Sequence, residues 1–203
     1  VNTKGIDGDV IWVTRSFENT PLLEWPSHVA IALKVLGRKV EKDGTLNLKP
    51  NQKLTLSVTM YSNYDKDDWK EKTIQKAQST TQSSIATIKK EHEGWWKDFW
   101  SHSNVQFGDS LIEKYYYASQ YLFGSTSRGD KFAPGIWGPF ITRDSSSWGG
   151  DYHLNYNYQA PYWAAYSSNY IDQTVNFDQP LLDYMEKGKQ HAQQLLHMKG
   201  IYY

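Results

Sequence analysis

The residues best suited to chemistry lie in one polar and aromatic segment in the second half of the chain. Asn155 and Asn157 stand two residues apart, at the expected junction between a loop and a helix. Their side-chain amides donate and accept hydrogen bonds without titrating, so the pair could hold one hydroxyl group or one water molecule. Helix capping is the alternative, because Asn is among the favoured capping residues. Capping explains one asparagine but leaves the other unexplained, together with the flanking Asp151, His153 and Gln159.

Aromatic side chains surround this pair at a density that core filling rarely demands. The 203 residues include nine Trp and 15 Tyr, and many stand beside polar residues, as in the run from Asp151 to Trp163. Flat aromatic faces next to polar groups suit sugar rings, which present apolar C–H patches edged by hydroxyl groups. We therefore expect Trp148, Gln159 and Trp163 to contact a carbohydrate. The alternative for any single aromatic residue is packing between helices.

Other common chemistries lack their residues in this sequence. The 22 basic and 22 acidic residues balance, so there is no electrostatic footprint for nucleic acid or an anionic membrane. Without cysteine, the chain can form neither a disulfide framework nor a thiolate zinc site. The segment from His92 to Trp96 begins like the zinc-binding helix motif but has Trp where the second His must stand. The sequence also contains neither a Gly-x-Ser-x-Gly nucleophile motif nor an apolar run of ~18 residues that could span a bilayer.

The first part of the chain predicts β-strands. Alternating or β-branched runs cover Asp9–Phe17, Ser27–Leu36 and Lys53–Tyr61. Three strands cannot close a sandwich alone, so we expect partner strands before Val1.

From Asp67 the pattern becomes helical. The stretch to about Trp100 contains no Pro and a single glycine, Gly94. Its apolar face ends in four aromatic residues, Trp95, Trp96, Phe99 and Trp100. The Gln/Ser/Thr-rich centre, Gln78–Ser84, is weakly helical, which allows a break there.

Three further helices are expected after this long helical stretch. The first spans about residues 109–123 and is capped by Asp109, the second about 154–168 and the third about 178–197, with Gly200 ending it. The residues expected on the buried side of the first are Leu111, Ile112, Tyr115, Tyr116 and Leu122. The loop of about 25 residues between the first two helices is rich in Gly, Ser and Pro, and loops of this length are usually functional.

Four short elements follow one another along this loop and the helix after it. They are Ser127-Arg128-Gly129, Pro134-Gly135-Ile136-Trp137-Gly138, the run from Trp148 to Gln159, and Tyr162-Trp163. Their order resembles glycoside hydrolase family 95, the inverting α-L-fucosidases and their relatives. The most specific part is Asp-Tyr-His-Leu-Asn-Tyr-Asn, residues 151–157, and the resemblance spans roughly residues 53–200.

The resemblance implies how the chain is divided. Residues 1–65 would be the end of an N-terminal β-sandwich domain, 66–104 a helical linker, and 105–203 the first half of an (α/α)6 barrel. Strands followed by helices fit two domains in series. The chain opens without Met, so we expect it to begin inside a longer precursor, with the remainder of its own polypeptide as a partner.

The resemblance also implies roles for particular residues. Asn155 and Asn157 match two asparagines that orient the attacking water and help to activate the general base, while His153 and Trp137 match positions that line the sugar pocket. The general acid, a Glu, and the general base, an Asp, come from later barrel loops, which would lie beyond Tyr203. In an inverting mechanism the acid protonates the leaving oxygen while the base activates water on the opposite face of the ring. No metal or organic cofactor is required.

The expected function is therefore exo-acting, inverting, α-L-fucosidase-like hydrolysis of terminal sugars of an oligosaccharide substrate, in the periplasm or outside the cell. Two alternatives stay open. One is a non-catalytic carbohydrate-binding protein that uses the aromatic loops only to hold glycan. The other is a glycoside phosphorylase with the same barrel, which uses phosphate in place of water. None of these functions calls for a nucleic-acid partner or a membrane span.

Overall fold

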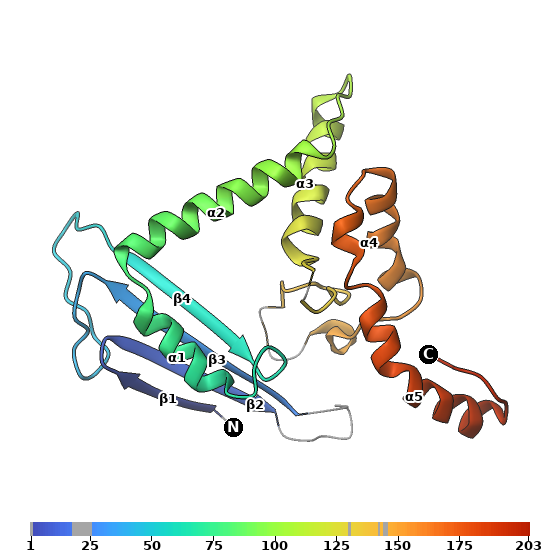
Figure 1. Cartoon of the computed structure of the whole chain (residues 1–203), viewed down its shortest axis with the longest axis horizontal. Coiled ribbons are helices and arrows are strands. Elements are labelled where there is room, and N and C mark those ends of the chain that lie inside the picture. Colours follow the sequence, from blue (N-terminus) through green and yellow to red (C-terminus); the bar gives the residue numbers. More distant parts are fainter. Residues whose placement is uncertain (1, 18–25, 130, 142, 144–145) are drawn as a thin grey trace. The chain divides into compact units, whose positions relative to one another are not determined.

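The computed structural model describes residues 2–17, 26–129, 131–141, 143 and 146–203. Contacts divide the chain into two compact units, Val1–Glu93 and Gly94–Tyr203. The first unit is built on a β-sheet and the second is helical (Figure 1). This order confirms the predicted fold class of strands followed by an all-helical region.

Four antiparallel strands among the described residues form one sheet. In sheet order they are β1 (Asn2–Asp7), β2 (Val10–Phe17), β3 (Ser27–Leu36) and β4 (Thr55–Ser62). The last three confirm the predicted strands to within one or two residues. β1 is an additional strand, and a two-residue loop that begins with Gly8, at φ +64°, joins it to β2.

One face of the sheet is covered by α1 (Trp69–Ser79), which lies over the strands in Figure 1. Ala77 of this helix packs against Val10 and Ala32, and all three are fully buried. The half-buried ring of Trp12 borders this core. Small side chains on the helix and on the sheet allow the two layers to approach closely.

The opposite face of the sheet carries large apolar side chains that are exposed. Val13, Ile31 and Met60 lie side by side across three neighbouring strands. The exposed apolar residues of this face, at 39–65 % exposure, are Ile6, Val13, Ile31, Leu56, Val58 and Met60. Since α1 already covers one face, this second apolar face calls for a further layer, and in a sandwich that layer is a second sheet. The pattern agrees with the predicted β-sandwich strands.

The long helical stretch breaks in two at its polar centre. α1 ends at Ser79, and α2 spans Gln82–Ser101. Between them Thr80 has an extended backbone, and its Oγ1 donates to the Lys76 carbonyl at 2.9 Å. Ser and Thr side chains that bond to the local backbone compete with the helical hydrogen bonds, which accounts for the break.

Three more α-helices follow in the described part of the second unit. They are α3 (Ser110–Thr126), α4 (Tyr156–Ser167) and α5 (Asp178–Leu196), with short 3-10 turns at Ser147–Gly150 and Ile171–Thr174. All three helices lie where the sequence predicts them. Asp109 caps α3 as expected, because its carboxylate accepts the N–H groups of Leu111 and Ile112 at 2.8 and 3.2 Å.

An aromatic cluster forms a core in the second unit. Phe99 of α2 is 2 % exposed, and its ring stacks on Tyr170 with 4.2 Å between centroids. Its other ring contacts, at 4.9–5.3 Å, are with Trp95, Trp96 and Trp100. Burial raises the pKa of Tyr170 to about 12. For these aromatic residues, packing between helices is the observed role.

The predicted buried side of α3 is wrong. Four of the five residues expected there are 48–67 % exposed, namely Leu111, Ile112, Tyr115 and Leu122. The buried positions of α3 are Gln120 and Gly124. Gly124 faces Phe99, whose ring atoms would lie 2.7 Å from a Cβ atom at this position. Because Gly124 has no side chain, its face of α3 can pack against Phe99. The periodicity of apolar residues does not reveal this choice of buried face.

We expect Gly124→Ala to destabilise the second unit by about 1–3 kcal/mol, because the added Cβ overlaps the Phe99 ring. Gly94→Ala is the matched control, since Gly94 also lies inside a helix but an added Cβ there meets nothing within 4 Å. Alanine at that position should stabilise by about 0.5–1 kcal/mol through its lower conformational entropy cost. Urea unfolding followed by circular dichroism compares the two variants, and equal effects would contradict the close packing of α3 on Phe99.

The end of α5 differs from the prediction. His197, with a left-handed backbone at φ +53°, caps the helix, so Gly200 does not end it. The chain then turns back, and the Tyr202 N–H donates to the Gly188 carbonyl at 3.0 Å. Gly188 permits this contact, because a Cβ there would lie 2.7 Å from the Ile201 side chain. The tail after α5 therefore packs on the helix that precedes it.

Candidate active site

Two segments of the loop between α3 and α4 are held together. The Ile136 N–H donates to the Asp151 carbonyl at 3.1 Å, and the Trp137 indole N–H donates to the Ser147 carbonyl at 2.8 Å. Gly135 sits at the closest approach, where a Cβ would lie 3.3 Å from a backbone oxygen of the neighbouring segment. The element from Pro134 to Gly138 and the run from Trp148 to Gln159, both predicted to be functional, therefore lie side by side.

Trp137 lines two cavities in the second unit and is 44 % exposed. The larger, of about 570 Å³, is mostly apolar; its lining residues from α3 and α4 are Ser119, Gln120, Leu122, Phe123, Thr126, Ala160, Pro161 and Ala164. The smaller, of about 200 Å³, is completed by Phe140, Ile141, Arg143, Ser146 and Ser147. An indole fixed by its N–H beside a cavity can present its face to a ligand.

Trp148, Asp151 and His153 form a contact group at the end of the loop. The Trp148 and His153 rings meet edge to face with centroids 4.8 Å apart, and His153 Nδ1 is hydrogen-bonded to the Asp151 carboxylate. Trp148 is 68 % exposed, whereas the His153 side chain is 23 % exposed. Both residues have a left-handed backbone, at φ +59° and +46°. This conformation costs a non-glycine residue about 1–3 kcal/mol and is concentrated at functional sites.

Asn155 and Asn157 lie at the start of α4, directly after His153. Asn155 is the N-cap residue, but its side chain makes no capping hydrogen bond. Asn157 follows in the first turn, and both residues are exposed. Pro161 inside the helix has no N–H, so it cannot complete the helical bond to the Asn157 carbonyl. Polar groups at this end of α4 are therefore accessible to solvent or to a ligand.

Gln159 and Trp163 lie further along α4. The Trp163 ring is 55 % exposed and contacts Tyr156 edge to face, with 5.4 Å between centroids. Gln159 is also exposed. Neither residue lines the two cavities beside Trp137. Their contact with a substrate stays a prediction.

A buried polar network lies at the base of the loop and was not anticipated from the sequence. Ser127 Oγ donates to the Gln173 carbonyl at 2.5 Å and lies 2.9 Å from Asn176 Oδ1. The Tyr162 hydroxyl donates to the same Asn176 oxygen at 3.3 Å, and Asn176 Nδ2 donates to the Lys131 carbonyl at 3.1 Å. The partners of Ser127 stand 35–49 positions further along the chain, so no local pattern identifies them. The network ties the loop to α4 and to the segment before α5.

Burial shifts the pKa of two other polar groups in this region, Arg128 and Tyr158. The Arg128 guanidinium lies 3.3 Å from the centroid of the Trp95 ring, and burial lowers its pKa. Burial, with smaller effects from neighbouring Tyr and Asp side chains, raises the pKa of Tyr158 well above its usual range. Tyr158 therefore stays neutral and donates to the Phe177 carbonyl at 2.6 Å. Arg128 acts here as a cation–π partner, and Tyr158 as a structural donor.

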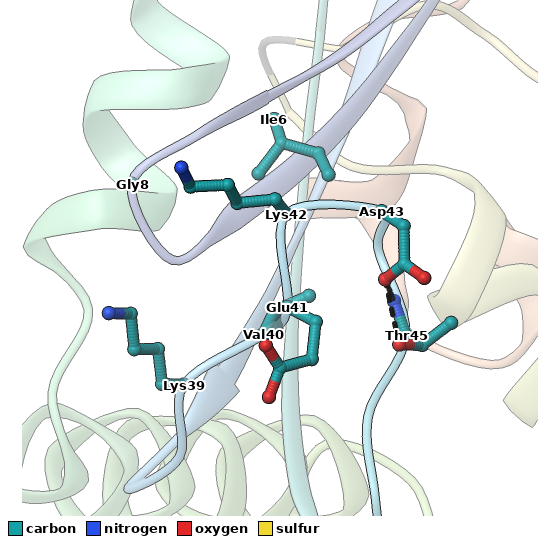
Figure 2. Close-up of a pocket in the computed structure, with 8 residues that line it drawn as sticks. All are labelled: Ile6, Gly8, Lys39, Val40, Glu41, Lys42, Asp43 and Thr45. Carbon is teal, nitrogen blue, oxygen red and sulfur yellow. Dashed lines mark hydrogen bonds between the residues drawn. The ribbon is translucent and has the colours of Figure 1, made fainter.

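A third cavity, of about 760 Å³, lies in the first unit between the β1–β2 turn and the segment 39–45 (Figure 2). Asp43 Oδ1 accepts hydrogen bonds from the Thr45 N–H and hydroxyl at 2.9 and 2.7 Å, and these bonds lower its pKa. In Figure 2 the side chains of Lys39 and Lys42 extend away from this carboxylate. The cavity carries both signs of charge and contains no residue predicted to contact a substrate.

The described ranges show neither a metal-binding cluster nor a membrane-spanning helix. They contain no group of three or more His, Asp or Glu side chains placed to hold a metal ion. None of their helices is long and apolar enough to cross a membrane.

The helical unit contains the long aromatic loop and the asparagines on which the family resemblance rests. Residues 65–203 match the glycosyl hydrolase family 95 catalytic domain. This match covers more than half of the chain, which therefore belongs to glycosyl hydrolase family 95. The predicted family and the predicted assignment of the helical region to its (α/α)6 domain are confirmed.

Two curated relatives carry the same name, "Probable alpha-fucosidase A". The protein of Aspergillus oryzae (strain ATCC 42149 / RIB 40) is 31 % identical over 87 residues, which are 42 % of this chain and 12 % of that protein. The protein of Aspergillus niger (strain ATCC MYA-4892 / CBS 513.88 / FGSC A1513) is 36 % identical over 86 residues, 41 % of this chain and 10 % of that protein. The matched segments thus span about a tenth of the relatives' length. No solved structure gives a significant match.

Proposed function

We propose that this chain supplies one wall of the active site of an exo-acting, inverting glycosidase that releases terminal α-L-fucose from oligosaccharides. The family membership supports a carbohydrate substrate, and the names of the two relatives support fucose as the sugar. The observation that carries the proposal is the surface formed by Trp137, Trp148 and His153, directly before the asparagines of α4. An oligosaccharide substrate also favours a periplasmic or extracellular location.

Each group on this wall has a role that follows from its chemistry. Trp137 and Trp148 expose ring surface for the apolar side of a sugar, and His153 offers a polar ring atom beside them. Asn155 and Asn157 would hold the attacking water. Amides can do this without adding a negative charge that would repel the general base. An inverting site needs room for that water, with roughly 6.5–9.5 Å between its two carboxyl groups. We assign the two carboxyl groups to barrel loops other than those in this chain.

Hydrolysis of 4-nitrophenyl α-L-fucoside by the full-length protein, followed by proton NMR, tests the proposal. Inversion requires that β-L-fucose appears first and the α-anomer only later by mutarotation. Release of the α-anomer first would contradict the mechanism. Turnover that depends on added phosphate would identify the phosphorylase alternative, and fucoside binding without turnover would identify the carbohydrate-binding alternative.

Trp137→Ala in the full-length protein is expected to weaken fucoside binding by ~1–2 kcal/mol, because an aromatic anchor is lost. The result is read as a rise in KM with kcat little changed. Trp137→Phe is the matched control: it keeps a ring face but loses the N–H bond to Ser147, so it should retain most of the affinity. Unchanged KM in Trp137→Ala, together with a large drop in melting temperature, would show that Trp137 serves the core instead.

A further inference from the structure

The hydrogen bond between Asp151 and His153 fixes which ring nitrogen of the histidine carries hydrogen. The carboxylate contacts Nδ1. An ionised carboxylate only accepts hydrogen bonds, so Nδ1 must be the protonated nitrogen. In the neutral ring, Nε2 then has a lone pair and accepts a hydrogen bond. The pair therefore presents an acceptor, at the far end of the imidazole from Asp151.

Both partners are held in position by independent contacts. The Asp151 carbonyl accepts the Ile136 N–H at 3.1 Å, which ties its backbone to the neighbouring loop segment. The His153 carbonyl accepts the Tyr158 N–H at 3.2 Å, so the left-handed backbone of His153 is attached to the first turn of α4. The Trp148 ring packs against the imidazole at 4.8 Å. Rotation of the ring would break the contacts with both Asp151 and Trp148.

We infer that Asp151 is a positioning residue that holds His153 with Nδ1 protonated, so that His153 Nε2 accepts a hydrogen bond from a hydroxyl group of the bound sugar. The inference rests on the proposed function for the presence of a sugar at this surface. It adds a recognition element: an acceptor beside the exposed Trp148 ring requires a hydroxyl donor next to an apolar sugar face. A sugar that lacks that hydroxyl would leave Nε2 without a partner.

Nitrogen-15 NMR of the histidine side chains tests the first half of the inference without substrate. His153 should show protonated Nδ1 in the wild-type protein. Asp151→Ala should shift it toward protonated Nε2, because the carboxylate acceptor that keeps hydrogen on Nδ1 is gone. Asp172→Ala is the control for charge loss, since Asp172 is exposed on a separate 3-10 turn. Protonated Nε2 in the wild type, or the same tautomer in Asp151→Ala as in the wild type, would overturn the inference.

Fucoside kinetics of the full-length protein test the second half. Asp151→Ala should raise KM by about 3- to 10-fold with kcat little changed, the effect of losing one neutral hydrogen bond. In the His153→Gln background, Asp151→Ala should add nothing, because Asp151 acts through the imidazole. The same increase in both backgrounds would show that Asp151 acts independently of His153. A wild-type protein that cleaves no fucoside would refute the proposed function, while the tautomer measurement would still decide the role of Asp151.

Discussion

Phe99→Ala is expected to destabilise the second unit by about 3–5 kcal/mol, the range for truncating a buried aromatic side chain. Phe99 is 2 % exposed and lies against Tyr170 and three tryptophans of its own helix. Removing the ring leaves a cavity that the flat, rigid neighbours cannot easily fill. Folded domains are stable by only about 5–15 kcal/mol, so this change removes a large share. Urea unfolding, followed by the fluorescence of the surrounding tryptophans, measures the loss.

Two further variants separate this core effect from a general loss of an aromatic ring. Phe107→Ala removes the same side chain from a position that is 38 % exposed and contacts Tyr116, so it should cost clearly less. In the Phe99→Ala background, Gly124→Ala should become stabilising, because the ring that its Cβ would overlap is gone. Equal costs at Phe99 and Phe107, or additive effects at Phe99 and Gly124, would contradict the packing described.

The order of elements could be predicted from the sequence because it depends on local signals. The strand and helix positions follow from apolar alternation and periodicity, and the Asp109 cap follows from residue type. β1 escaped detection, because its sequence is polar and contains Gly5, although the loop dipeptide Gly8-Asp9 is a recognised hairpin signal. The buried side of α3 was assigned wrongly, since a close approach at Gly124 outweighs the apolar residues on the exposed side.

The candidate site could be located but not assembled from the sequence. Trp137, Trp148 and His153 were identified as candidates individually. Their arrangement depends on hydrogen bonds between groups 10–15 positions apart, from the Ile136 N–H to the Asp151 carbonyl and from the Trp137 indole N–H to the Ser147 carbonyl. Side-chain patterns do not encode such bonds. Likewise, the left-handed backbone of Trp148 has no composition signal, because Trp does not favour this conformation. The roles of the individual residues stay predictions.

The asparagine pair carries the largest expected effect on catalysis. If Asn155 and Asn157 hold the attacking water, Asn155→Ala and Asn157→Ala should each lower kcat by ~10²–10³, because each removes a preorganised polar group. Substrate affinity should change little, since the water and not the sugar is the group they hold. The double variant should lose less than the product of the two single effects, because both amides serve one water molecule.

Helix capping predicts a different result for the same variants. Capping would give a stability loss of ~1 kcal/mol for Asn155→Ala and near-normal turnover. The structure already weakens this alternative, since Asn155 occupies the N-cap position without a side-chain capping bond. Asn155→Asp separates the two roles, because Asp caps helices as well as Asn but lacks the amide donor and adds a charge. The water-holding role requires that this variant melts normally and turns over slowly. The measurements are kcat, KM and melting temperature in the full-length protein, and normal kcat in both alanine variants would exclude a catalytic role for the pair.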